Sequence, residues 1–267
     1  MSNLHITFHC PALACPAEFY MVMPDKNLPP FLVAKNPHYQ RPTKTLVMLH
    51  GYSGDYRDWL HNGGASALSL AYNLAVVMPT GGTSFWLDQP ATGQKWCSLV
   101  GEDLINYLRS TFGLAQTRED TLIGGNSMGG FGAMHTALAY PDRFSGAAAL
   151  SAAYIVDQLP EMTPDMKNPI ANYEYYCRIF GDLKTAPERD CNPKVLFKRN
   201  AAEGKANPRL YLACGEQDFG IASNRAMAEF LKKQGADYTY REGPGVHDWS
   251  FWVPRAEEAV KWLLGCE

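Results

Sequence analysis

One serine stands in a setting that favours nucleophilic chemistry. Residues 125–129 read Gly-Asn-Ser-Met-Gly, the pattern G-x-S-x-G, between an apolar segment at 121–125 and a small-residue segment at 128–140. A strand that turns sharply into a helix leaves no room for side chains at the two glycines and lifts the serine hydroxyl above the sheet. The pattern therefore predicts that Ser127 is a nucleophile. A serine that only caps the helix is the alternative.

A serine hydroxyl needs a base to take its proton, and the expected chain order in such a fold is Ser, then Asp or Glu, then His. Among the seven histidines, His247 follows Ser127 and lies in a loop after a predicted strand. His135 also follows, but it lies eight residues into the helix and is expected to pack or to face solvent. His247 is therefore the predicted base.

A carboxylate must fix the tautomer of that base. Asp218 lies in a loop just past the carboxyl end of the apolar segment 209–214, where such an acid is expected. Glu216 is the competing carboxylate, although it comes sooner after the strand and is expected to be solvated. Asp237 opens a strand, and Asp248 is expected to cap the last helix.

Two backbone N–H groups are expected to bind the oxyanion that forms when the serine attacks a carbonyl group. One is the N–H of Met128, directly after the nucleophile. The other lies in the loop His50-Gly51-Tyr52-Ser53-Gly54, and Tyr52 N–H is the predicted donor. His50 is expected to hold this loop in place, and a simple strand-ending turn is the alternative for the His-Gly pair.

Elements that position these residues alternate along the chain. Apolar runs predict buried strands, and amphipathic segments predict helices, so the order indicates a mostly parallel, doubly wound α/β sheet with helices on both faces. We expect one domain over residues 1–267, with an irregular, cap-like or lid-like insertion at about 152–207. The expected strands cover 4–13, 18–24, 44–51, 74–79, 121–125, 145–150, 209–214 and 237–241, and the helices cover 65–73, 96–112, 128–140, 221–234 and 249–264.

Composition excludes several other classes. The net charge is −3 and the basic residues are scattered, so neither nucleic acid nor a membrane surface is an expected partner. The sequence shows no signal peptide and no apolar run long enough to span a bilayer, which predicts a cytoplasmic protein. Seven irregularly spaced cysteines predict free thiols, although a Cys10–Cys15 bridge is conceivable.

Nucleotide and metal motifs are missing from the sequence. Neither G-x-G-x-x-G nor G-x-x-x-x-G-K-[ST] occurs, and there is no H-E-x-x-H or similar cluster. We therefore expect neither a cofactor nor a bound metal.

Several ordered motifs together resemble the tributyrin esterase branch of the esterase D family. That family includes S-formylglutathione hydrolases and is similar to feruloyl and acetylxylan esterases. The resemblance runs from about residue 5 to the end of the chain. The motifs are His50-Gly51-Tyr52-Ser53-Gly54 with Trp59, Ala75-Val76-Val77-Met78-Pro79, Gly125-Asn126-Ser127-Met128-Gly129-Gly130, Cys214-Gly215-Glu216-Gln217-Asp218 and His247-Asp248-Trp249-Ser250-Phe251-Trp252.

This resemblance implies an α/β-hydrolase fold and a cofactor-free serine carboxylesterase that cleaves short-chain acyl esters of small molecules. It implies Ser127, Asp218 and His247 as nucleophile, acid and base. A feruloyl or acetyl carbohydrate esterase, an S-formylglutathione-type thioesterase and, further off, an acyltransferase remain alternatives. Homo-oligomers are expected on family grounds only. The sequence is equally consistent with two roles, lining the site or packing in the core, for the apolar side chains of Trp86, Met128, Tyr154 and Tyr176.

Overall fold

A computed structural model describes residues 1–25, 27–166 and 170–266. Within them, eight strands form a single sheet in the order β1-β2-β4-β3-β5-β6-β7-β8. The strands are β1 (Ser2–Cys10), β2 (Cys15–Met23), β3 (Lys44–Leu49), β4 (Leu74–Pro79), β5 (Thr121–Asn126), β6 (Gly146–Leu150), β7 (Arg209–Gly215) and β8 (Tyr238–Gly243).

The sheet is mostly parallel, as predicted. Strands β3 to β8 run parallel to one another, whereas β1 and β2 form an antiparallel hairpin, and β2 pairs with β4 in the antiparallel direction. Because the six parallel strands point the same way, their carboxyl ends meet at one edge. That edge is where ligands bind in sheets of this kind.

Buried apolar runs explain the central strands. Every residue of β4 and β5 is buried, which is typical of strands covered on both faces. Alternate residues of β3 supply the two cores: Leu46 and Met48 belong to one hydrophobic cluster, and Val47 and Leu49 belong to the other. This period of two is the expected consequence of strand geometry.

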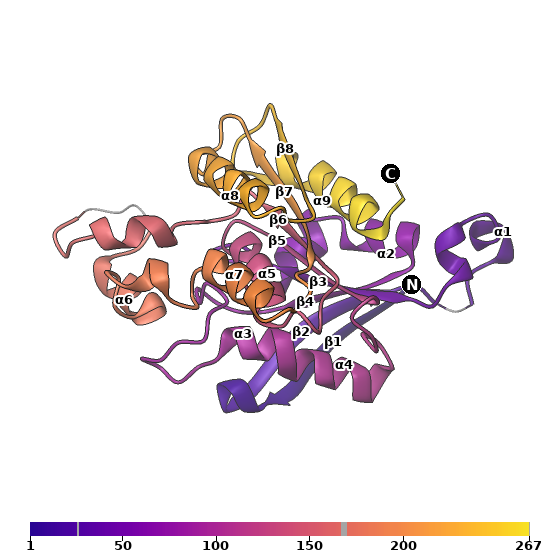
Figure 1. Ribbon diagram of the computed structural model, residues 1–267. Helices are drawn as coiled ribbons and strands as arrows, with labels where there is room; N and C mark the ends of the chain where they lie inside the picture. Colours follow the sequence, from indigo (N-terminus) through magenta and orange to yellow (C-terminus); the bar gives the residue numbers. More distant parts are fainter. Residues whose placement is uncertain (26, 167–169, 267) are drawn as a thin grey trace.

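Helices cover both faces of the sheet (Figure 1). Helices α2 and α9 pack on one face, whereas α4, α5 and α8 contribute to the core on the other. The helices are α1 (Pro30–Val33), α2 (Ala65–Tyr72), α3 (Trp96–Ser98), α4 (Leu104–Phe112), α5 (Met128–Ala139), α6 (Tyr173–Phe180), α7 (Pro193–Ala202), α8 (Ile221–Lys233) and α9 (Trp249–Leu264).

The predicted helix at 96–112 is interrupted. A π-helical turn at Leu99–Asp103 lies between α3 and α4, and the helix ends at Gly113, which has a φ of 65°. Gly101 lies inside the π-helical turn, and a Cβ there would come within 2.2 Å of the Tyr140 ring. Amphipathic spacing identifies the helix but does not reveal this local change in hydrogen bonding.

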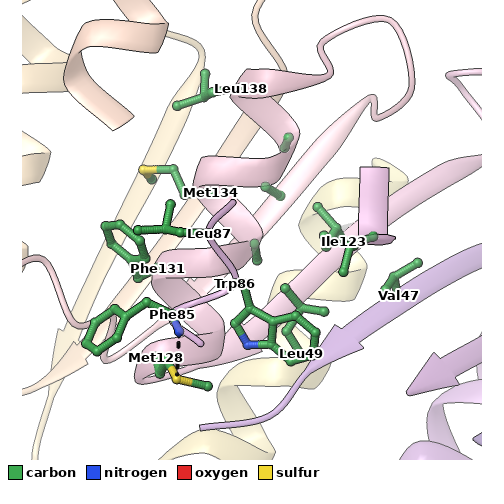
Figure 2. Close-up of a cluster of buried hydrophobic side chains, with 14 of the residues drawn as sticks. Val47, Leu49, Phe85, Trp86, Leu87, Ile123, Met128, Phe131, Met134 and Leu138 are labelled. Atoms are coloured by element: carbon green, nitrogen blue, oxygen red, sulfur yellow. Dashed lines mark hydrogen bonds between the residues drawn. The ribbon is translucent and has the colours of Figure 1, made fainter. Parts of the chain in front are cut away.

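Helix α5 is the buried helix that follows the predicted nucleophile. Figure 2 shows Phe131, Met134 and Leu138 along one side of it, next to Phe85. The Met128 side chain is also buried, and its sulfur accepts a hydrogen bond from the Phe85 N–H at 3.3 Å. The first turn of α5 is therefore fixed to the neighbouring loop.

The insertion at 152–207 is more regular than predicted. It contains α6, α7 and short 3₁₀ turns at Val156–Glu161 and Ala186–Glu188. The segment is rich in proline, which favours irregular chain, yet Pro193 occupies the first turn of α7, where no N–H partner is needed. The Asn192 side chain caps this helix by accepting from Lys194 N–H at 3.1 Å.

Contacts with the rest of the fold hold the insertion against α5 and the loops around it. The Tyr175 hydroxyl donates to Thr83 O at 2.7 Å, and Asn200 Nδ2 donates to Leu138 O at 2.8 Å. Phe180 meets Phe85 at a ring-centroid distance of 5.1 Å. The insertion therefore shares the core on this face of the sheet.

All seven cysteines are free thiols. Cys10 and Cys15 face each other in the β1–β2 hairpin but form no disulfide. No helix in the described ranges is both long and apolar enough to cross a membrane.

Candidate active site

Three side chains from the carboxyl ends of three parallel strands form one hydrogen-bonded chain. The Ser127 hydroxyl lies 2.9 Å from His247 Nε2, and His247 Nδ1 lies 2.8 Å from Asp218 Oδ2. Because a carboxylate only accepts, Nδ1 carries the proton and Nε2 is left free to accept from the serine. The residues predicted as nucleophile, base and acid therefore meet, although 120 residues separate the serine from the histidine.

The backbone at Ser127 adopts a strained conformation. Its φ is 54° and its ψ is −120°, a region that costs a non-glycine residue about 1–3 kcal/mol. A Cβ at Gly125 would lie 2.4 Å from Gly129 O, and a Cβ at Gly129 would lie 2.1 Å from Leu49 O. The two glycines let β5, α5 and β3 approach closely enough to hold the serine in this turn.

The Asp218 carboxylate is fully buried but well supplied with donors. Burial by itself raises its pKa, because it disfavours the charged form. The hydrogen bonds from His247 and from Gly220 N–H, the latter at 2.7 Å, outweigh burial and lower the pKa of Asp218 below its ordinary value. The group therefore stays ionised at neutral pH and faces Nδ1 as an acceptor.

Aromatic rings surround the imidazole of His247. The Phe219 ring lies 4.3 Å from it between centroids, and Trp252 meets it edge-on at 5.0 Å. Gly245 N–H donates to Gln217 Oε1 at 2.8 Å, which links the loop of the base to the loop of the acid. These contacts fix the ring plane that both hydrogen bonds require.

Two backbone N–H groups next to the serine are available as donors. Within the described ranges, neither Tyr52 N–H nor Met128 N–H donates to any protein acceptor. Ser127 N–H, in contrast, is bonded to Leu150 O at 2.8 Å. Gly51 brings the two segments together, because its Cβ position lies 3.6 Å from Ser127 Cβ.

His50 holds the loop that carries Tyr52. It is completely buried; Gly81 N–H donates to its Nε2 at 2.9 Å, and its Nδ1–H donates to Gly51 O at 2.7 Å. Burial lowers the pKa of His50, so the neutral form is favoured in the folded protein. This agrees with the prediction that His50 is structural.

The lowered pKa of His50 predicts a pH dependence of stability. In the unfolded chain, His50 takes up a proton as the pH falls through about 6.5, whereas in the folded protein it stays neutral to a lower pH. The stabilising effect of His50 is therefore present above about pH 6.5 and declines as the pH falls below that value. His50→Leu removes the buried acceptor of Gly81 N–H and costs about 1–3 kcal/mol at pH 8.

Urea denaturation of the wild type and of His50→Leu checks this prediction between pH 8 and pH 5. The difference in unfolding free energy between the two proteins should shrink toward the acid end, because only the wild type loses the His50 contribution. A difference that is constant over the whole range would contradict the assigned neutral state.

The remaining sequence candidates lie outside the hydrogen-bonded chain. His135 is buried, with Nε2 2.8 Å from Asp190 O, so it packs within the fold. Glu216 is exposed, and Asp248 caps α9 by accepting from Ser250 N–H at 2.9 Å. Four apolar side chains could either line the site or pack in the core according to the sequence, and all four are buried, namely Trp86, Met128, Tyr154 and Tyr176.

Phe219 is the neighbour of the site that sequence reasoning missed. It directly follows Asp218, and its ring packs on His247 while remaining largely in solvent. The sequence signal for a role in the site is that an apolar aromatic residue lies in a loop after a predicted strand. That signal does not distinguish a site residue from an ordinary surface residue.

Comparisons with known proteins agree with this geometry. A family model described as "Putative esterase" matches residues 28–263. The acetyl esterase of Caldicellulosiruptor saccharolyticus is 41% identical over 220 residues, which cover 82% of this chain and 83% of that protein.

Two solved structures from Staphylococcus aureus are similar over 98% of both chains. The fluorophosphonate-binding serine hydrolase FphF, solved with substrate bound, matches with a TM-score of 0.83 at 26% identity. The S-formylglutathione hydrolase FrmB, solved as apoenzyme, matches with a TM-score of 0.80 at 25% identity.

The sheet, its helices and these matches define an α/β-hydrolase, as predicted. The chain belongs to the esterase family, and the resemblance to the esterase D group is confirmed. It is a carboxylic ester hydrolase that acts on small-molecule esters.

Proposed function

We propose that this esterase hydrolyses short-chain acyl esters, acetyl esters first among them, through an acyl-enzyme on Ser127. The observation that carries the proposal is the unbroken hydrogen-bonded chain from Asp218 through His247 to Ser127. The 41% identity to an acetyl esterase supports the choice of acyl group.

In the first half of the reaction, His247 Nε2 takes the proton from Ser127 Oγ as the oxygen attacks the ester carbonyl carbon. The N–H groups of Tyr52 and Met128 bind the oxyanion that forms. The ionised Asp218 stabilises the imidazolium. His247 then gives its proton to the alcohol oxygen, the C–O bond breaks, and the acyl group stays on Ser127.

In the second half, water takes the place of the alcohol. His247 removes a proton from the water, whose oxygen attacks the acyl carbon, and the second tetrahedral intermediate uses the same two N–H donors. Collapse returns the proton to Ser127 and releases the acid. An added alcohol that attacks in place of water would give transesterification instead.

Rates on a series of p-nitrophenyl esters test the proposed acyl preference. We expect kcat/KM to be highest for acetate or butyrate and to fall for octanoate and for ferulate. Activity confined to ferulate, or found only with S-formylglutathione, would replace the proposal with a feruloyl esterase or a thioesterase. Products formed with added alcohols measure the acyltransferase alternative.

We also propose that residues 1–267 fold as one domain in which 152–207 is a cap, and that the protein works in the cytoplasm. The contacts of Tyr175, Phe180 and Asn200 with the rest of the fold support the cap. The urea curves described for His50 would then show a single transition for the wild type. Two separated transitions would contradict a single domain.

A further inference from the structure

Phe219 is a large apolar side chain that the fold leaves mostly in water. It is 74% exposed, yet its ring lies 4.3 Å from the His247 imidazole between centroids, at an interplanar angle of 37°. Val246, which directly precedes His247, is also an exposed apolar residue. One of these exposed apolar residues directly follows Asp218 and the other directly precedes His247, and the pair is called the apolar rim below.

An exposed phenyl ring gains little from folding, because most of its surface stays hydrated. A ligand that covers it would remove that surface from water and would also gain the contact energy of a stacked ring. Isolated exposed apolar residues are common on protein surfaces and by themselves indicate nothing. What distinguishes Phe219 is its contact with the imidazole that forms part of the reacting chain.

The direction of proton transfer shows which part of a substrate reaches this rim. His247 Nε2 delivers its proton to the oxygen of the departing alcohol, so that oxygen must come within hydrogen-bond distance of Nε2. The acyl carbon, in contrast, is bonded to Ser127. The alcohol part is therefore the part of the ester that meets the imidazole, and the Phe219 ring packs on the same imidazole.

We propose that Phe219 is a stacking platform for the alcohol part of the substrate, and that this esterase selects esters of cyclic alcohols with a flat face. An aryl alcohol and the apolar face of a pyranose sugar share this chemistry. The proposal rests on the proposed function, because it needs His247 to protonate the leaving alcohol. It is independent of which short acyl group is preferred.

Three acetyl esters test the platform: ethyl acetate, phenyl acetate and a methyl glucopyranoside monoacetate. For each protein, the kcat/KM of each cyclic ester is divided by that of ethyl acetate, so differences in intrinsic reactivity cancel between variants. Phe219→Ala should lower this ratio about tenfold, and Phe219→Tyr should retain it. A drop with the sugar ester alone, or with phenyl acetate alone, identifies the ring that the platform serves.

Phe31→Ala is the matched control, because Phe31 is 80% exposed and lies in α1, at the opposite end of the molecule from α6 (Figure 1). It removes an equally exposed phenyl ring and should leave the ratios unchanged. Phe219→Leu keeps apolar bulk without a flat face and should fall between the wild type and Phe219→Ala.

Two results would overturn the platform. If Phe219→Ala lowers all three esters equally, the ring only orients His247, and if it changes no ratio, the ring contacts no substrate. Failure of the proposed function looks different. In that case the acyl group would not be found on Ser127 of the wild type, whereas a failed platform leaves that adduct in place.

Discussion

Ser127→Ala should reduce kcat for p-nitrophenyl acetate by about 10⁶-fold while the protein remains folded. The hydroxyl lies 2.9 Å from His247 Nε2, which can take its proton, and in the described part of the chain the N–H groups of Tyr52 and Met128 donate to no protein acceptor. Residual activity should come from the oxyanion donors and from binding, which act on water attack as well. Stopped assays with purified variant at high concentration measure the loss.

A control serine separates this effect from a general one. Ser110 lies on the exposed side of α4, and its hydroxyl donates to Tyr107 O at 3.3 Å. Ser110→Ala should retain wild-type rates. If Ser127→Ala keeps more than about a hundredth of the wild-type kcat, the assignment of the nucleophile is wrong.

Asp218→Asn should lower kcat about 10⁴-fold with little change in shape. An amide in place of the carboxylate presents an N–H group to His247 Nδ1, and the imidazole then moves its proton to Nε2. In that tautomer Nε2 no longer accepts the proton of Ser127. The full burial of Asp218 means that no water can substitute for the lost acceptor.

The same change should also cost stability at neutral pH. The pKa of Asp218 is lowered in the folded state, so its contribution to stability is present above the unfolded pKa and is lost as pH falls through the folded pKa. Wild type and Asp218→Asn should therefore approach each other in unfolding free energy under acid conditions. For the loss of kcat in Asp218→Asn, the control is Glu216→Gln, which changes the exposed neighbouring carboxylate and should leave kcat unchanged.

Local sterics made much of the site predictable from sequence. The turn from β5 to α5 allows little beyond G-x-S-x-G, because the Cβ positions of Gly125 and Gly129 meet backbone atoms. Buried parallel strands carry long apolar runs, so the ends of β5, β7 and β8 were located closely enough to choose among the carboxylates and histidines. Chain order then singled out Asp218 and His247.

The insertion and the rim were not predictable in the same way. A high content of proline favours irregular chain, yet Pro193 begins α7 with Asn192 as its cap, a position where proline favours a helix. Phe219 was not predictable for a different reason. Its role depends on a contact with His247, which lies 28 residues further along the chain. Neither periodicity nor propensity encodes a contact of that kind.

Trapping the acyl-enzyme tests the central claim most directly. The wild type is mixed with p-nitrophenyl acetate, quenched in acid within the first turnover, digested and examined by peptide mass spectrometry. We predict one acetyl group on Ser127 of the wild type and none in Ser127→Ala. Where His247→Ala is acetylated, its acetyl group should be longer-lived, because the base that activates water is missing. Acetyl on another side chain that forms and decays at the catalytic rate, or full turnover by Ser127→Ala, would contradict the account.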